Sequence, residues 1–417
     1  MRILIHSINY APEVISVGKY NSEMAEWLAN RGHEVRVVTA PPYYPAWRVG
    51  EGYSARTYRR EWVAGADVWR CPLWVPSEPS GTKRMLHLAS FAASSFPVML
   101  RQVTWRPDVV MVTEPPLFCV PQAQLIARLS GAKVWLHILD FEVEAALHLG
   151  MLRGWGDVER LLYKVEHLVM RGIDKVSTIS EKMRRRIVEK GVPEDRVCLF
   201  PNWADMDFVR PLRHDNEVRR EFGAGPDDVL VLYAGNMGEK QGLELVLDAA
   251  ERLRERVKIR FAMVGAGAAR ERLRRIAEER KLHNLRFFAV QPLERLPLML
   301  AAGDIHLVVQ RREAADLVMP SKLTNIFAAG RPSIATVDPG TAVYAILKGH
   351  DCGFTTPPGS ATGLVAGIVA LAEDIQTRER LGRNARRYAQ SYLRKYKILS
   401  DFENGLQDLI GSKSKQS

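Results

Sequence analysis

Two successive series of short apolar runs, with amphipathic stretches between them, restrict the possible folds of this chain more than any other feature. The first series lies in the first 200 residues, and its strand candidates are residues 3–6, 35–39, 109–113, 133–138, 175–180 and 197–200. Strands that alternate with helices predict a mostly parallel sheet with right-handed crossovers. We therefore expect one doubly wound α/β domain in this half of the chain.

The same pattern begins again after a polar stretch at 210–228 that ends in a cluster of turn residues. Its strand candidates are residues 229–235, 258–265, 285–290, 304–309 and 332–337. Amphipathic stretches at 359–374 and 377–411 close the chain, whose 417 residues suit two domains. We predict two Rossmann-like domains facing a central cleft at the carboxyl ends of both sheets, where such sheets bind ligands.

The net charge of +11 indicates an anionic partner, which the composition alone leaves open between nucleic acid, anionic lipid and a phosphorylated substrate. The four cysteines lie far apart and form no C-x-x-C pair, so neither a zinc site nor a disulfide framework is expected. The first residues, MRILIH, form a strand pattern rather than a signal peptide. These features predict a cytoplasmic protein.

One segment, residues 83–106, indicates contact with a membrane. Lys83 and Arg84 precede the apolar run Leu86 to Leu100, and Arg101 and Arg106 follow it. The run is shorter than the roughly 20 residues needed to span a bilayer. A helix that lies on an anionic membrane surface fits this pattern, and a buried core helix is the alternative.

Two glycine-rich turns lie between a strand candidate and a helical run in the C-terminal half. The first contains Asn236, Gly238 and Lys240, and the second begins at Gly265. Such turns bring backbone amides close to a phosphate, and Lys240 would add a full positive charge. A turn with a solvated lysine is the alternative for the first. The second lacks the complete dinucleotide-binding fingerprint.

A third element, residues 319–332, is the clearest candidate for anion binding. Pro320 and Ser321 suit the first residues of a helix, so the amides of Ser321 and Lys322 would be free to bind an anion. The Lys322 side chain would reach a phosphate oxygen. Asn325, one turn further, would face the same side.

Taken in this order, the three elements resemble the GT-B retaining glycosyltransferases of family 4. The resemblance also includes Ser180, residues 191–208 and the N-terminal YAPE with Gly18, and it covers nearly the whole chain. Residues 137–142 and 320–325 are similar to the colanic acid branch of exopolysaccharide synthesis. The resemblance implies an acceptor domain at 1–208, a nucleotide-sugar domain at 209–395, and a C-terminal helix at 396–417 that returns towards the first domain before a disordered tail.

The resemblance also implies roles for single residues. Lys240 and Lys322 would neutralise the donor diphosphate beside the Ser321 amide. Gly18 would let the loop after the first strand approach the pyrophosphate or donor sugar, and His137 and Asp140 would position acceptor and donor sugar. A structural role at the end of a strand is the alternative for His137 and for Asp140. The remaining donor-binding positions are Asn236, Gly238, Gly265, Gln291, Asp316, Leu323 and Asn325.

This sequence departs from the family pattern at two places. Relatives often carry two glutamates eight positions apart where this chain has Leu317 and Asn325, and Asp316 would replace the first. Asn325 can still hydrogen-bond a ribose hydroxyl, although less strongly than a carboxylate. Asn236 stands where relatives usually have an arginine beside the diphosphate.

The family's chemistry implies retention of configuration, through charge stabilisation of the departing diphosphate, with no metal and no other cofactor. The triplet Asp205 to Asp207 lies in the connection to the second domain, so we assign it no metal. Expected partners are a nucleotide-diphosphate sugar, a lipid-linked glycan acceptor and an anionic membrane, without nucleic acid. A non-hydrolysing 2-epimerase using Glu142 and Glu144 and a basic membrane-associated scaffold are the rivals.

Overall fold

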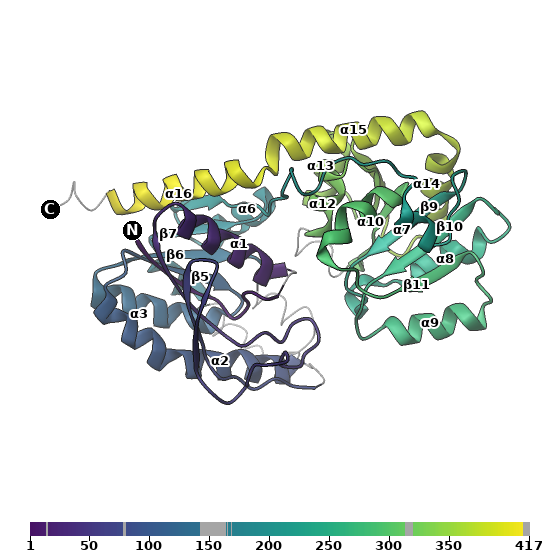
Figure 1. Cartoon of the computed structure of the whole chain (residues 1–417). Helices are drawn as coiled ribbons and strands as arrows, with labels where there is room; N and C mark the ends of the chain where they lie inside the picture. Colours follow the sequence, from purple (N-terminus) through teal and green to yellow (C-terminus); the bar gives the residue numbers. More distant parts are fainter. Residues whose placement is uncertain are drawn as a thin grey trace. The chain divides into compact units, whose positions relative to one another are not determined.

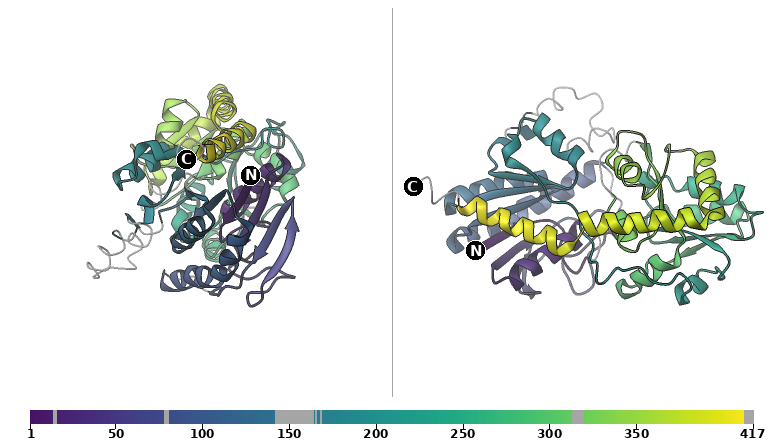
Figure 2. Two further views of the ribbon diagram at one scale, coloured as in Figure 1. Left: turned by 90° about the vertical axis from the view of Figure 1, so that its left-hand side faces the viewer. Right: turned by 90° about the horizontal axis from the view of Figure 1, so that it is seen from above.

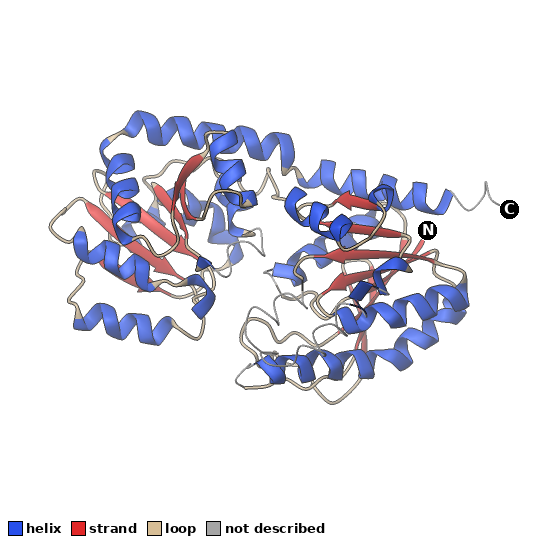
Figure 3. Cartoon of the chain, turned by 180° about the vertical axis from the view of Figure 1, so that it is seen from behind, coloured by secondary structure: helices blue, strands red, loops and turns tan. Residues whose placement is uncertain are grey.

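The computed structural model describes residues 1–13, 16–77, 81–141, 164, 166–167, 169–312 and 320–411. They form two compact units, Met1–Pro201 with Tyr396–Ser417, and Asn202–Lys395. In each unit, strands form a central sheet with helices on both sides (Figure 1; Figure 3). The units meet in sequence at Pro201 rather than after residue 208, because Ala204 and Val209 are buried in the core of the second unit.

The first unit contains an eight-stranded sheet with the order β3-β4-β2-β1-β5-β6-β7-β8. Only the β3–β4 pair is antiparallel among the described pairings. The strands are β1 (Arg2–His6), β2 (Glu34–Thr39), β3 (Arg59–Val63), β4 (Ala66–Arg70), β5 (Val109–Glu114), β6 (Lys133–Ile138), β7 (Lys175–Thr178) and β8 (Val197–Leu199). All six strands predicted for this half are confirmed, and the hairpin β3–β4 was not predicted.

Helices pack on both faces of this first sheet. One face carries α1 and the C-terminal helix α16, and the other carries α2 and α3 (Figure 1). The helices are α1 (Ser16–Asn30), α2 (Gly81–Gln102), α3 (Val120–Ser130), α6 (Glu181–Glu189) and α16 (Lys395–Gly411), with 3-10 turns η1 (Val103–Trp105), η2 (Leu117–Cys119) and η3 (Glu194–Arg196).

The C-terminal helix α16 completes the core of the first unit (Figure 2). Phe402 stacks on Phe200 with ring centroids 4.3 Å apart, and its ring meets Trp135 of β6 edge-on at 4.9 Å. The buried Glu403 bonds to Arg31 and His33, which follow α1. The chain therefore builds this unit from both of its ends.

The second unit contains a six-stranded parallel sheet with the order β11-β10-β9-β12-β13-β14. The strands are β9 (Val229–Ala234), β10 (Ile259–Val264), β11 (Leu285–Phe288), β12 (Ile305–Val308), β13 (Ser333–Thr336) and β14 (Gly353–Thr356). Successive strands run outward from β9 to β11, and the chain then returns to β12 beside β9. The strand order therefore reverses between β9 and β12, the point at which such sheets bind ligands.

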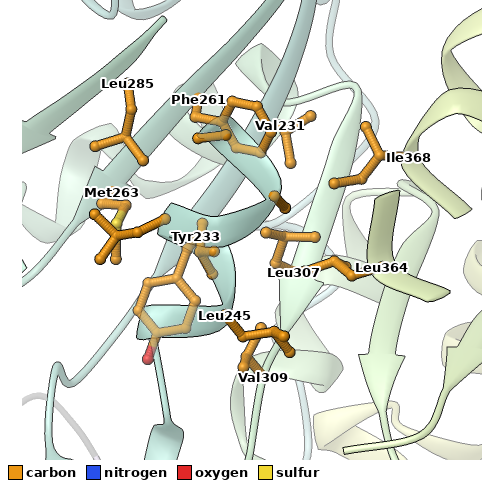
Figure 4. Packing of buried hydrophobic residues seen from close by; sticks show 14 of the residues in the cluster. Val231, Tyr233, Leu245, Phe261, Met263, Leu285, Leu307, Val309, Leu364 and Ile368 are labelled. Carbon is orange, nitrogen blue, oxygen red and sulfur yellow. The ribbon is translucent and has the colours of Figure 1, made fainter. Parts of the chain in front are cut away.

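Two apolar layers hold the second sheet, because its strands are buried on both faces. Val231 and Tyr233 point into the layer under α8, α9 and α14 (Figure 4), and Leu230 and Leu232 point into the layer that includes α7 and α10. The helices are α7 (Glu217–Glu221), α8 (Glu244–Arg252), α9 (Arg270–Glu279), α10 (Leu296–Ala302), α12 (Lys322–Ala328), α13 (Ala342–Gly349), α14 (Ala361–Glu373) and α15 (Ile375–Tyr392), with 3-10 turns η4 (Glu239–Gln241) and η5 (Leu293–Arg295).

Candidate functional site

The two predicted glycine-rich turns of the second unit pack directly against each other. A Cβ atom on Gly265 would lie 2.0 Å from the carbonyl oxygen of Gly235, and one on Gly267 would lie 2.5 Å from that of Met237. The three glycines at these contacts, Gly235, Gly265 and Gly267, have φ between +146° and +148°, a range that residues with a side chain disfavour. Backbone bonds from Met237 to Ala266 and from Ala269 to Met237 lock the turns together. Glycine is therefore required here for close packing of two loops.

Lys322 brings the third predicted element to the same place. Its Nζ lies 3.2 Å from where a Cβ on Gly235 would be, and 4.1 Å from the centre of the Tyr233 ring. Tyr233, at the end of β9, donates its hydroxyl to the carbonyl oxygen of Asn236 at 2.6 Å. Sequence analysis did not identify Tyr233, although it is an aromatic residue two positions before the first glycine of the turn. The three elements thus meet at the point where the strand order reverses.

The charge of Lys322 is not balanced by any carboxylate among the described residues. Burial lowers the pKa of this lysine to about 8, because water no longer stabilises the ammonium ion fully. An anion beside Nζ would reverse that effect. The site is thus arranged to favour a negatively charged ligand.

The start of α12 supports part of the prediction for this helix. Within the described residues, the amides of Ser321 and Lys322 make no backbone hydrogen bond, and the Asn325 side chain is partly exposed. Leu323 is different: its side chain is fully buried, and its amide donates to Pro320 at 3.0 Å. The contact of Leu323 with a donor therefore stays a prediction.

The other predicted donor residues of the second unit lie in loops at the carboxyl ends of strands. Lys240 is exposed in η4, with no ion pair to a described residue. Asn236 is exposed, and the amide of Gly238 donates to Gln241. Gln291 follows the edge strand β11, where it bonds to Ala289 and Arg295. Their contacts with a donor remain predictions, and Asp316 lies outside the described residues, as do Glu142 and Glu144.

In the first unit, His137 is a buried histidine rather than an open ligand contact. Its Nδ1 lies 2.9 Å from Ser177 Oγ, which also accepts from Trp135, and its ring packs against Phe200. Only 5% of the residue is exposed, and burial lowers its pKa to about 3, so the ring is neutral near pH 7. A contact of His137 with the sugar substrates stays a prediction. Asp140 lies two residues beyond β6, and its role remains a prediction.

Gly18 does not lie in a loop, as predicted, but in the first turn of α1. A Cβ there would lie 2.7 Å from the Cβ of Glu13 and 2.9 Å from its carboxylate. Glu13 is buried, and its carboxylate accepts bonds from the amides of Tyr43 and Tyr44 and from the Asn9 side chain, at 2.8 to 2.9 Å. Gly18 therefore gives space to a buried carboxylate, and its approach to a pyrophosphate stays a prediction. The sequence signal for Glu13 was its place in YAPE, just after β1.

The described residues contain no group of three or more His, Cys, Asp or Glu side chains that could hold a metal ion. In the Asp205 to Asp207 triplet, the Asp205 carboxylate accepts the amides of Asp207 and Phe208 and so closes a turn. Among the described helices, none is long and apolar enough to cross a bilayer.

A cavity of about 1080 Å³ lies at the opposite edge of the second sheet, where its strands begin. Its lining mixes acidic residues such as Asp228 and Glu379 with basic ones such as Lys258 and Arg383. Ligands of open parallel sheets bind beyond the carboxyl ends of the strands. We therefore prefer the glycine-rich turns as the candidate site.

Comparison with known proteins identifies both halves of the chain. Residues 17–203 match the glycosyl transferase 4-like domain, and residues 214–388 match the glycosyl transferases group 1 domain. Over 414 residues the sequence is 46% identical to the putative colanic acid biosynthesis glycosyl transferase WcaI of Escherichia coli (strain K12), covering 97% of this chain and 100% of that protein.

Solved structures show the same fold. Sucrose-phosphate synthase from Thermosynechococcus elongatus superposes with a TM-score of 0.75 at 15% identity, over 99% of this chain and 100% of that chain. Anabaena Alr3699/HepE in complex with UDP and glucose gives a TM-score of 0.72 at 13% identity, over 98% and 99%. Two Rossmann-like units of this kind define the GT-B class of glycosyltransferases. Within that class, the chain belongs to glycosyltransferase family 4.

Proposed function

We propose that this glycosyltransferase moves a sugar, with retention of configuration, from a nucleotide-diphosphate sugar to a polyprenyl-linked glycan during exopolysaccharide assembly. The position of Lys322 beside the packed turns at Gly235 and Gly265 carries the proposal for the donor. The 46% identity to a protein named for colanic acid biosynthesis supports the pathway. A similar GT-B structure contains UDP and glucose, which supports the class of donor.

Charge stabilisation explains how such a site would promote transfer. Negative charge grows on the diphosphate as its bond to the sugar breaks, and Lys322, the helix amides beside it and Lys240 would stabilise that charge. The acceptor hydroxyl would attack on the same face, and the leaving phosphate would take its proton. Neither a metal nor another cofactor is part of this proposal.

The helices α2 and α3 provide the surface that we propose for membrane contact. They pack together on one face of the first sheet, where Gln122 bonds to the carbonyl of Ala92. The buried side of α2 includes Phe91, Val98 and Met99, so the core-helix alternative describes one side of this helix. Exposed apolar side chains from η2, α2 and α3 are Leu86, Leu100, Phe118, Leu125 and Leu129. Exposed cations on and next to these elements are Lys83, Arg84, Arg101, Arg106 and Arg128.

This surface suits the inner, anionic face of the cytoplasmic membrane, because apolar side chains enter the bilayer interface and cations meet lipid headgroups. Cosedimentation with vesicles of phosphatidylglycerol and phosphatidylcholine tests it. We expect binding to the anionic vesicles that Leu125→Glu with Leu129→Glu abolishes. Equal binding by this variant, or transfer only to soluble acceptors, would overturn the membrane part of the proposal.

The donor is tested by thermal shift with UDP, GDP, ADP and CMP in the presence of EDTA, since a ligand that binds the folded state raises the melting temperature. We expect one nucleoside diphosphate to stabilise the protein without metal. Lys322→Ala should remove the shift and lower turnover by at least about tenfold. Lys258→Ala is the matched control, because this exposed lysine lies at the opposite edge of the same sheet.

The rival activities make different predictions for the same protein. The family and the similar proteins described above are transferases, which gives the 2-epimerase alternative no support. Isomerisation of the donor without acceptor would nevertheless restore it. A scaffold would show vesicle binding without any nucleotide-dependent shift or turnover.

A further inference from the structure

An aromatic cluster in the first unit includes a buried polar atom, Nε2 of His87, that has no hydrogen-bond partner among the described residues. The rings of Tyr43, Trp47 and His87 contact one another, with centroids 4.6 to 5.7 Å apart. His87 is only 1% exposed, and its Nε2 is buried without a hydrogen bond. Leaving a buried polar atom unpaired costs about 1–3 kcal/mol. A fold that keeps such an atom at one place indicates a use for it.

The other nitrogen of His87 determines what this free atom can do. Nδ1 lies 2.6 Å from the carbonyl oxygen of Trp74, which only accepts, so Nδ1 carries the proton. Burial lowers the pKa of His87, so the ring is neutral near pH 7. Nε2 therefore holds a lone pair and accepts a hydrogen bond. Its imidazole ring packs against the rings of Tyr43 and Trp47, and the atom can accept from a hydroxyl or an amide donor.

The segment that carries Trp47 is a closed loop whose tryptophan ring contacts the His87 ring. Bonds from Gly50 to Pro42 and from Arg48 to Tyr43 tie its two ends together. The Glu13 carboxylate anchors this loop by accepting hydrogen bonds from the amides of Tyr43 and Tyr44. The backbone of Trp47 itself has φ +50°, a left-handed conformation that a tryptophan adopts at a cost.

Cationic and aromatic side chains surround the same cluster. The guanidinium of Arg84, in the first turn of α2, lies 5.8 Å from the centre of the Trp47 ring. The backbone of Trp74 is held by two hydrogen bonds: its amide donates to Ser90 Oγ, and its carbonyl oxygen accepts from His87 Nδ1. Of this tryptophan, 45% is exposed. The cluster thus offers flat apolar faces, one acceptor atom and a nearby positive charge.

We propose that Trp47, Tyr43 and His87 form the subsite that binds a sugar ring of the acceptor glycan. This inference rests on the proposed transferase function. A pyranose presents an apolar face of C–H groups to an aromatic ring, and its rim carries hydroxyl donors. The sugar ring would take the place between Trp47 and His87 as the loop that carries Trp47 moves aside. One sugar hydroxyl would then donate a hydrogen bond to Nε2 of His87. Such pockets combine aromatic walls with few placed polar groups.

The position of the cluster suits an acceptor that is attached to lipid. His87 and Arg84 belong to α2, the helix whose exposed side contributes Leu86 and Leu100 to the proposed membrane surface. A glycan held at this subsite would therefore lie next to the lipid that carries it. The cations Lys83 and Arg84 at the start of α2 would face the phosphates of the carrier.

Saturation-transfer NMR on the full chain tests the subsite directly. The probes are methyl α-D-glucopyranoside, methyl β-D-galactopyranoside and methyl α-L-fucopyranoside, with uridine as the comparison. We expect a signal from at least one glycoside that Trp47→Ala and His87→Phe lower at least about fivefold. Trp47→Phe and His87→Gln should keep most of it. Trp62→Ala is the matched control, because 72% of this tryptophan, on β3, is exposed.

Melting temperatures and the nucleotide-induced shift, measured on every variant, separate the possible failures. If nucleotides stabilise the protein but no glycoside signal depends on Trp47, the subsite is wrong and the transferase proposal stands. If glycosides bind through Trp47 while no nucleotide binds, the subsite stands and the donor proposal fails. A signal from uridine that depends on Trp47 while the glycosides give none would also overturn the subsite. Equal losses in Trp47→Ala and Trp62→Ala would do the same.

Discussion

The carboxyl edges of the two sheets are built in opposite ways. In the second unit, Gly235 and Gly265 leave bare backbone around Lys322, whose charge has no carboxylate beside it among the described residues. In the first unit, the carboxylate of Glu13 is saturated by three N–H donors and covered by Gly18. An edge with a spare positive charge suits an anion, and an edge with its charge already satisfied suits a neutral ligand. The two edges thus support the proposal that the two units bind different ligands.

We expect the largest effect when a side chain is added to the bare backbone of the packed turns in the second unit. In Gly265→Val, the new Cβ meets the Gly235 carbonyl, and valine disfavours the φ of +148° at this residue. We expect the free energy of unfolding to fall by about 3 kcal/mol or more and nucleotide binding to disappear. Urea unfolding and thermal shift measure both. Gly349→Ala is the control, because a Cβ there meets open space; normal nucleotide binding by Gly265→Val would refute the role of the packed turns.

Titration of Lys322 should give the next largest effect. Its pKa of about 8 means that the ammonium ion loses its proton as the pH rises above that value. Affinity for the nucleoside diphosphate should then fall by up to about tenfold per pH unit. Lys322→Arg keeps its charge and should show a flat profile between pH 7 and 9.5, as measured by calorimetry. Parallel profiles for the two proteins would show that another group controls binding.

Removal of the Glu13 carboxylate tests the other edge. Glu13→Ala leaves the amides of Tyr43 and Tyr44 unpaired, so we expect a loss of about 2 kcal/mol in urea unfolding. Glu13→Gln keeps one acceptor oxygen and should lose less. Nucleotide binding belongs to the second unit and should be unchanged in both variants. If Glu13→Ala is as stable as the parent protein, the carboxylate does not hold the loop.

The parent protein and Glu13→Gln should also differ in how their stability depends on pH. Burial raises the pKa of Glu13, so the folded chain keeps its proton at a pH where the unfolded chain has released it. The stability that this group contributes is therefore present below the unfolded pKa and is lost as the pH rises through the folded pKa. Relative to Glu13→Gln, the parent protein should become less stable over this range. The opposite trend would mean that the hydrogen bonds outweigh burial.

The smallest change expected concerns Asn325. If this residue contacts the ribose of the donor, Asn325→Glu should tighten nucleotide binding by about threefold to tenfold, because a carboxylate accepts hydroxyl bonds more strongly than an amide does. Calorimetry with the preferred diphosphate measures this. Weaker binding would indicate that Asn325 lies near the phosphates instead, and would sharpen the position of the donor on the second unit.

The sequence predicted the strands well where they are buried on both faces, because a continuous apolar run marks such strands. It missed the hairpin β3–β4, whose first strand begins Arg59, Arg60, Glu61 and lacks such a run. The meeting of the three elements that are predicted to bind an anion was also foreseen, since each follows a strand of a parallel sheet and the carboxyl ends of these strands share one edge. Topology therefore brings these elements together without any knowledge of side-chain packing.

The sequence did not predict the direction of single side chains. In a strand that is buried on both faces, the sequence does not show which face His137 takes, and its ring lies under Phe200. Gly18 was placed in a loop because nothing in the sequence fixed the start of α1. Leu323 was carried over with its neighbours, although a helix turns it into the core. Such details depend on contacts between residues far apart in the sequence.

The helix α16 has a consequence for how the protein is made. Chains emerge from the ribosome with their N-terminus first, and domains usually fold in that order. Here a nascent chain that ends at Pro201 lacks Phe402, which covers Trp135 and Phe200. The second unit, which is continuous in sequence, can fold while the first unit still lacks the helix α16. The first unit is therefore completed only after the second unit has been synthesised.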